Sequence, residues 1–284
     1  MPSTLDPAFL QRAYDMVRCQ RLQVPDRQAV YFRTPPFRIA YEAALQPQKD
    51  GVREDGSPKK GGYTVKGYFD PRFVQSGPHV WGAKRNCMPP ALQPLLDEMI
   101  ATSKARLSAF NVQWEQIIGA DGLNWPFRLQ DGEIDKRTFQ LRKGAQPGGV
   151  MFSTGSSQLK PAVGQLMPDG SERPITDPKE LKSGYWAFAV VSIWFNPGQL
   201  EPKKKGSPGV SLNLDRLVLL AQDEPFYQAG DGAPVAFEHV AQGLAGLQAP
   251  PSAGLPPAAP PAYGQPPAAP AAYGQPPQYG VPQQ

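Results

Sequence analysis

Apolar residues near the N-terminus recur at the spacing of an amphipathic helix. They are Leu10, Ala13, Tyr14 and Val17. Asp6 and Pro7 precede them, and these residue types are typical of the N-cap and the first position of a helix. The sequence therefore predicts a short helix from residue 7 to about residue 20, packed on the outside of a larger domain.

The next two patterned segments alternate apolar and polar residues with the period of two that strands show. The first covers residues 29–45 and is divided by Pro35-Pro36, after which its apolar face carries Phe37, Ile39 and Tyr41. The second covers residues 61–74. Its apolar face carries Tyr63, Val65 and Phe69, and its other face carries Thr64, Lys66 and Tyr68. We expect a strand in each segment and a long lysine-bearing loop between them.

Residues 89–119 have the strongest helical pattern of the chain, opening with prolines and closing with glycine. One apolar stripe runs along them, formed by Leu92, Leu95, Leu96, Met99, Ile100, Leu107, Phe110, Trp114 and Ile117. Such a stripe is typical of contact with a hydrophobic core. We therefore expect one long helix packed against the domain.

Residues 184–196, GYWAFAVVSIWFN, are uncharged and aromatic. The segment is too short to cross a bilayer as a helix, so we expect no membrane association. As a strand, it places Trp186, Phe188, Val190, Ser192 and Trp194 on one face. The opposite, more aliphatic face carries Tyr185, Ala187, Ala189, Val191, Ile193 and Phe195, and we expect this face to line the interior of a barrel.

Composition divides the chain into two parts. The chain has 284 residues with 35 prolines and 28 glycines. Through residue 240, short strands separated by Gly/Pro turns predict a small barrel or sandwich, with a last strand from Ser211. Residues 241–284 hold no Lys, Arg, Asp or Glu and repeat Pro, Ala, Tyr and Gln, so we expect a disordered tail. The predicted domains are thus residues 1–240 and 241–284.

Catalytic motifs are not found in the sequence. It has no phosphate-binding loop, dinucleotide fingerprint or serine nucleophile elbow. Two cysteines and two histidines provide neither a disulfide framework nor a zinc site. We predict a protein that is not an enzyme and holds no cofactor or metal. The N-terminus shows no secretory signal, which favours a cytoplasmic location.

Basic residues are interleaved with aromatic ones throughout the first part. The net charge is +4, and the interleaved groups are Tyr31 to Arg38, Lys66 to Phe73, Trp81 to Arg85 and Trp125 to Arg128. Proteins that bind single-stranded nucleic acid use this mixture, because cations follow the phosphates while rings stack on bases. Most rings in any β domain are nevertheless core residues. Trp186 and Trp194 are candidates for stacking, with core packing under the helix as the alternative for their face.

Several segments together resemble the single-stranded DNA-binding proteins of tailed phages, an OB-fold family. In order along the chain they read RTPPFRIAY, YTVKGYF, NWPFRLQDG, SSQLKPAV, SGYWAFAVVSIWF and GVSLNLDRLVLLAQDEPF. The resemblance covers about residues 29–227. It implies a mainly β fold, an OB barrel elaborated by the long helix and the short N-terminal helix. It also implies sequence-independent binding of single-stranded DNA during phage replication or recombination, in the host cytoplasm.

The matching strands imply the positions of the DNA-binding residues. Arg33, Arg38, Lys66, Tyr68 and Lys160 fall in or near the concave face, and Lys59, Lys60 and Lys203, Lys204 and Lys205 fall on loops at its rim. Arg72, Trp186 and Trp194 complete the predicted set. They come from the residue pattern and not from the family motif.

The chain departs from the family in two ways. Family members commonly end in an acidic tail that recruits replication partners, whereas this tail is uncharged. We still consider it the candidate contact for replication or recombination proteins. The helix of residues 89–119 exceeds a minimal OB fold and is a candidate for self-association. Two alternatives remain open: a virion structural protein with a Pro-rich docking tail, and a recombination protein that anneals single strands.

Overall fold

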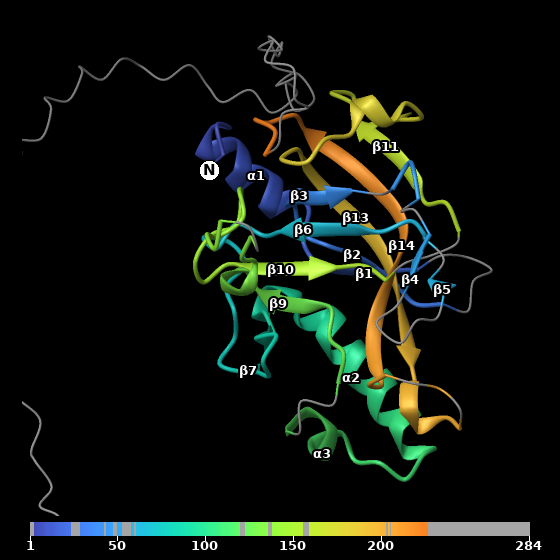
Figure 1. Cartoon of the computed structure of the whole chain (residues 1–284). Helices are drawn as coiled ribbons and strands as arrows, with labels where there is room; N and C mark the ends of the chain where they lie inside the picture. Colours follow the sequence, from blue (N-terminus) through green and yellow to red (C-terminus); the bar gives the residue numbers. More distant parts are fainter. Residues whose placement is uncertain are drawn as a thin grey trace, which may run out of the picture. The chain divides into compact units, whose positions relative to one another are not determined.

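The structure of the chain is a computed structural model (Figure 1) that describes residues 3–23, 29–42, 44–47, 50–52, 58–59, 61–119, 123–135, 138–155, 159–202, 204 and 206–226. This part is mainly β. Its helices are α1 (Pro7–Met16), α2 (Gln93–Ser108) and α3 (Trp114–Gly119), and its short 3-10 turns are η1 (Pro90–Leu92), η2 (Gln130–Gly132), η3 (Pro178–Glu180) and η4 (Gly198–Leu200). The predicted tail and the boundary near residue 240 lie outside the described residues.

Five strands close into a barrel. They are β3 (Phe37–Glu42), β6 (Val65–Tyr68), β10 (Val150–Ser153), β13 (Trp186–Asn196) and β14 (Gly209–Ala221). Antiparallel pairing gives the order β14-β13-β3-β6-β10. Thr154, just after β10, forms a parallel bridge with Leu212 of β14, and the Gly155 N–H donates to the Leu212 carbonyl at 2.8 Å. This closed strand order is that of an OB fold.

The remaining strands extend this barrel. They are β1 (Gln20–Leu22), β2 (Tyr31–Arg33), β4 (Gly51–Val52), β5 (Pro58–Lys59), β7 (Val80–Trp81), β8 (Asn86–Cys87), β9 (Phe127–Leu129), β11 (Ala162–Leu166) and β12 (Glu172–Pro174). The pair β1–β2 adds to β13, the pair β11–β12 adds to β14, and β9, β8 and β7 continue the sheet beyond β10. A separate two-stranded sheet, β4–β5, lies in the loop between β3 and β6.

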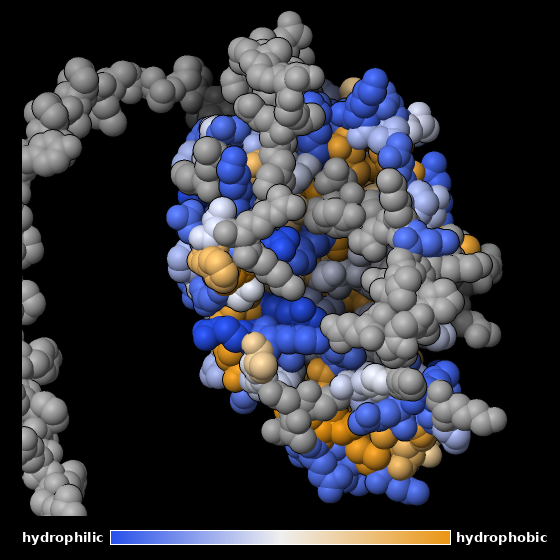
Figure 2. All heavy atoms as spheres, in the orientation of Figure 1, coloured by the Kyte–Doolittle hydropathy of each residue, from blue (hydrophilic) through white to orange (hydrophobic). Residues whose placement is uncertain are grey.

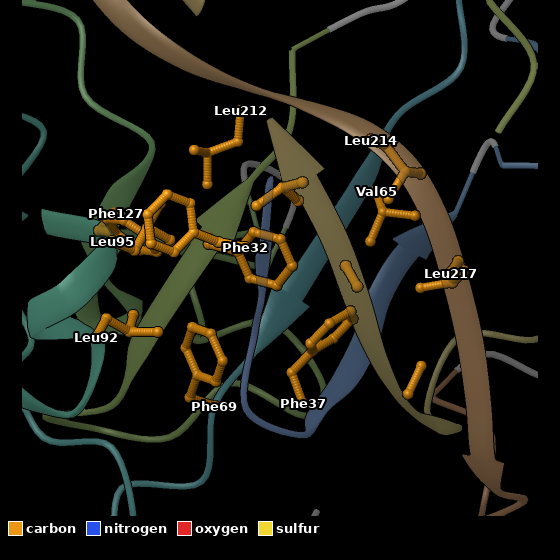
Figure 3. Packing of buried hydrophobic residues seen from close by; sticks show 14 of the residues in the cluster. Phe32, Phe37, Val65, Phe69, Leu92, Leu95, Phe127, Leu212, Leu214 and Leu217 are labelled. Carbon is orange, nitrogen blue, oxygen red and sulfur yellow. The ribbon is translucent and has the colours of Figure 1, made fainter. Parts of the chain in front are cut away.

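The barrel interior is filled by aromatic and aliphatic side chains from many elements (Figure 3). Phe37, Phe127 and Phe152 are fully buried, and the rings of Phe37 and Phe152 meet edge to face at 4.6 Å. Gly67 of β6 faces these two rings, and a Cβ at this position would overlap both of them. The glycine therefore lets two phenyl rings pack against the strand backbone.

Most of the predicted pattern is found in the structure. Asp6 caps α1 by accepting from the Ala8 N–H at 2.9 Å. On β13, Ala187, Ala189 and Val191 are fully buried, so the aliphatic face lines the barrel as predicted. The apolar stripe of the long helix is core contact, since its members Leu92, Leu95, Leu96, Met99 and Leu107 are at most 1% exposed.

The predicted long helix is interrupted. It begins as the 3-10 turn η1, continues as α2 to Ser108, and restarts as α3 at Trp114. Between them Asn111 has a φ of +58°, a conformation that a continuing right-handed helix excludes and that asparagine tolerates. The N-terminal helix also ends earlier than predicted, because Gln20 joins strand β1. In the part of the chain that the structure describes, no helix has the length and apolarity needed to cross a membrane.

Candidate nucleic-acid interface

One row of side chains crosses the outer face of the barrel. Neighbouring strands pair these residues directly, from β8 to β13: Asn86, Arg128, Met151, Tyr68, Arg38 and Trp186. Directly opposed residues project to the same face of a sheet. In OB folds, the face of the second and third strands binds oligonucleotides, and here these strands are β6 and β10. The row therefore identifies the outer face of β6 and β10 in this chain.

A cluster of four side chains lies at the β3 and β13 end of this row. We call it the buried lock, and it consists of Arg38, Asp223, Trp186 and Phe226. The Arg38 guanidinium lies 3.4 Å from the Asp223 carboxylate, and both side chains are at most 3% exposed. The Trp186 indole N–H donates to the same carboxylate at 3.0 Å. Arg38 also covers the Phe226 ring, 4.3 Å from its centroid.

Asp223 accepts hydrogen bonds from distant parts of the chain. The hydroxyls of Ser3 and Thr4 each donate to it at 2.6 Å, and the Glu224 N–H donates at 2.7 Å. Burial opposes ionisation of this carboxyl, but Arg38 and these hydrogen bonds outweigh burial, so the pKa of Asp223 lies below its ordinary value. The carboxylate is thus charged and fully engaged.

The sequence prediction placed Arg38, Tyr68 and Trp186 among the DNA-binding residues, and the structure buries all three side chains. They are 2%, 4% and 1% exposed. Burial lowers the pKa of Arg38, whose Nε and Nη2 donate to the carbonyls of Gly184 and Glu224, each at 3.0 Å. Strand periodicity had put Arg38 and Tyr68 on the outer face, which is correct. Residues from elsewhere in the chain then cover that face.

The middle of the row is covered by the segment that follows η2. Tyr68 and Met151 pack with Ala145 and Phe226 in a small cluster separate from the main core. Glu133 accepts from the Lys66 ammonium at 2.6 Å and from the Tyr68 hydroxyl at 3.3 Å. Lys66 therefore lies on the predicted face, half-buried and paired with a carboxylate.

The β8–β9 end of the row is more open. Arg128 of β9 is half-buried, and its side chain has neither a hydrogen bond nor an ion pair among the described residues. Burial lowers its pKa, and Glu133 partly opposes this effect. Figure 2 shows hydrophilic residues gathered in the middle of the view, where Figure 1 places β9 and β10. Arg128 is thus the cation of the row that is available to a phosphate.

In OB folds the loop between the fourth and fifth barrel strands flanks this face, and in this chain that loop joins β13 to β14. Trp194, near the end of β13, is 58% exposed, in contrast to the buried Trp186. Lys204 in the loop pairs with Glu201, while Lys203 and Lys205 lie outside the described residues. The other flanking loop of OB folds joins the first and second barrel strands, which are β3 and β6 here. There Lys59 is described only as a backbone position in β5, and Lys60 lies outside the described residues.

Three other predicted residues lie away from β6 and β10. Arg33 on β2 donates to the Gln20 side chain at 3.0 Å. Arg72 is held by Asp70, with one donor–acceptor distance of 2.6 Å, and this hydrogen bond raises the pKa of the guanidinium. Lys160 is exposed beside a pocket of about 580 Å³ whose lining comes from β1, β2, β11, β13, β14 and residues 159–161. A DNA-binding role for these residues stays a prediction.

Sequence reasoning missed the segment of residues 133–143. Its turn carries Phe139, which is 82% exposed, and it is followed by Arg142 and Lys143, whose side chains have no partner in the described ranges. The only available signal was a phenylalanine among basic residues, without the alternation that marks a strand. Within the described residues, no group of three or more His, Cys, Asp or Glu side chains could hold a metal ion.

No protein-family model and no curated protein matches this chain. Among solved structures, it is similar to the single-stranded DNA-binding protein from bacteriophage Enc34 in complex with single-stranded DNA. That similarity has 17% identity and a TM-score of 0.44, over 74% of this chain and 98% of that chain. It is also similar to gp2.5, a single-stranded DNA-binding protein encoded by bacteriophage T7. There the identity is 13% and the TM-score 0.37, over 71% of this chain and 90% of that chain.

Proposed function

We propose that this protein binds single-stranded DNA without sequence preference and catalyses no reaction. The strand order carries the proposal. It identifies β6 and β10 as the strands whose outer face binds oligonucleotides in OB folds, and the β3–β6 and β13–β14 loops as the two that flank that face. Both loops carry lysines in this chain. The resemblance of the sequence to phage single-stranded DNA-binding proteins supports the same function.

The proposed contacts divide into two kinds. Arg128 and the loop lysines Lys59, Lys60, Lys203 and Lys205 neutralise phosphates. Lys66 and Lys204 do so in exchange for their ion pairs with Glu133 and Glu201. Trp194 offers an exposed indole to a base, and such stacking contributes about 1–3 kcal/mol per base. Because every base has an aromatic face, this arrangement tolerates any sequence. Arg38, Tyr68 and Trp186 support the barrel and are left out of the proposed contacts.

The biological role follows from binding only one form of DNA. A protein that binds single strands and not the duplex shifts the equilibrium toward the single strand by mass action. We therefore propose that it coats exposed strands during phage replication or recombination in the host cytoplasm. The uncharged tail is the proposed contact for other proteins of these processes, and the helix of residues 93–108 is the proposed surface for self-association.

Titration with oligo-dT, followed by tryptophan fluorescence, tests the binding function. We expect quenching at low salt, with an observed affinity that falls by about 0.7 log units per log unit of salt for each phosphate neutralised. Trp194→Phe should retain most of the affinity but lose much of the quenching, because Trp194 is the most exposed indole described. A duplex of the same length should bind much more weakly.

Two results would reject this function. The first is fluorescence that does not respond to oligo-dT, or responds with no dependence on salt. The second is sedimentation as a large defined assembly that is indifferent to single strands, which would favour a virion structural protein. Faster annealing of complementary strands in the presence of the protein would add an annealing activity to the binding function.

A further inference from the structure

Residues 133–135 and 138–142 pair as the two sides of a short hairpin on the outside of the barrel. Ile134 and Leu141 form an antiparallel bridge. Below them the Arg142 N–H donates to the Glu133 carbonyl at 2.8 Å. Above them the Asp135 N–H donates to the Gln140 carbonyl, also at 2.8 Å. The base of the hairpin is therefore held by backbone hydrogen bonds on both sides of the bridge.

Phe139, at the end of this hairpin, has an unfavourable backbone conformation and an exposed hydrophobic side chain. Its φ is +56°, in the left-handed region that residues with a Cβ rarely adopt. Its ring is 82% exposed, the largest exposed fraction among the large hydrophobic residues of the described part. Residues held in rare backbone conformations cluster at ligand-binding sites, where the surrounding structure keeps them in place. Here the Phe139 N–H donates to the Asp135 carbonyl at 2.8 Å, which fixes the turn.

The hairpin is fastened to the proposed DNA-binding face. At its base Glu133 accepts hydrogen bonds from Lys66 and Tyr68 of β6. Beyond its other strand, Ala145 is buried with Tyr68 and Met151, and Leu141 packs against this cluster. Arg142, the last residue of the hairpin, and Lys143, the next one, are exposed cations without a partner among the described residues. The hairpin thus carries one ring and two cations at the edge of β6.

We infer that Phe139 is a base-stacking residue for a single strand that passes on the outside of this hairpin where it covers β6 and β10, with Arg142 and Lys143 contacting the neighbouring phosphates. This inference rests on the proposed binding function. Stacking removes an exposed ring from water without any rearrangement of the protein, since the hairpin already holds it. The combination of an exposed ring and adjacent cations is the one that single-stranded nucleic acid requires.

Substitution of Phe139 gives a test that separates binding from folding. Loss of one stacked base costs about 1–3 kcal/mol, so Phe139→Ala should weaken oligo-dT binding by about 5- to 150-fold, with an unchanged salt slope. Phe139→Gly should weaken binding equally and raise the melting temperature, because glycine adopts a positive φ freely. Phe139→Trp should retain affinity and add quenching on binding.

Leu159→Ala is the matched control. Leu159 is 81% exposed, and it lines the pocket whose walls include neither β6 nor β10. Its loss should leave the affinity for oligo-dT unchanged. If the wild-type chain binds oligo-dT while Phe139→Ala binds equally well and Phe139→Trp adds no quenching, the stacking role is wrong and the binding function stands. Unchanged DNA affinity with altered sedimentation of Phe139→Ala would assign the ring to a protein contact, which also overturns the inference.

Discussion

Two regions of this barrel contain the same mixture of basic and aromatic side chains in opposite states. In the buried lock, Arg38 has a carboxylate, two carbonyls and an aromatic ring as partners. In the set of exposed side chains that we call the open rim, which are Phe139, Arg142 and Lys143 on one segment and Trp194 on another, both rings are more than half exposed. The difference teaches that the presence or absence of partners, and not residue type, separates a structural cluster from a binding surface.

The largest expected effect comes from removing the carboxylate of the lock. Asp223→Ala leaves Arg38 buried without a countercharge, and breaking a buried pair in this way costs about 3–5 kcal/mol. We expect the free energy of unfolding, measured by urea denaturation, to fall by this amount. The affinity of the folded protein for oligo-dT should change little, because the lock lies beneath the surface.

Glu224→Ala provides the control for this comparison. Its side chain is exposed, its hydrogen bonds to the lock come from the backbone, and its carboxylate acts on Arg38 only through space, so the stability should change by less than about 0.5 kcal/mol. One outcome would remove the distinction between the buried lock and the open rim. If Asp223→Ala left stability intact and abolished DNA binding, the lock would belong to the interface.

Lowering the pH should also destabilise the buried lock, with a smaller loss of stability than Asp223→Ala causes. The pKa of Asp223 is lower in the folded protein than its ordinary unfolded value of about 3.9. Its contribution to stability is therefore complete above that value and is lost as the pH falls through the folded pKa. Each unit of difference corresponds to about 1.4 kcal/mol.

Unfolding measured between pH 6 and pH 2 should show this loss in the wild-type chain. Asp223→Asn lacks the titrating group, so its stability should fall less over the acid part of that range. Parallel curves for the two proteins would show that other carboxyl groups account for the acid sensitivity. In that case the lock would contribute through packing and not through charge.

Local periodicity accounts for what the sequence predicted well. The alternation in residues 61–74 gave the correct faces of β6, because every strand obeys the same two-residue period. The N-cap at Asp6 and the buried stripe of α2 are likewise local or helical signals. The OB order was not available from periodicity and came from the resemblance alone.

Contacts between distant residues account for what the sequence could not predict. Ser3 and Asp223 are 220 positions apart, and their hydrogen bond helps to bury Arg38 and Trp186. The sequence around Arg38 and around Trp186 does not indicate that Ser3 and Asp223 cover these two side chains. Phe139 was missed for a different reason, since the conformation that exposes it is a backbone angle and its segment has no periodic pattern.

The smallest expected effect concerns the cations of the open rim. Arg142→Gln with Lys143→Gln should lower the slope of log affinity against log salt by about 0.7 for each lost phosphate contact. Phe139→Ala should instead weaken binding at every salt concentration and leave the slope unchanged, because stacking releases no counterions. Lys179→Gln is the matched control. That lysine is exposed in η3, after β12, and its loss should not change the slope. Equal slopes for the wild type and the double variant would remove both cations from the open rim and leave Phe139 and Trp194 as its only contacts.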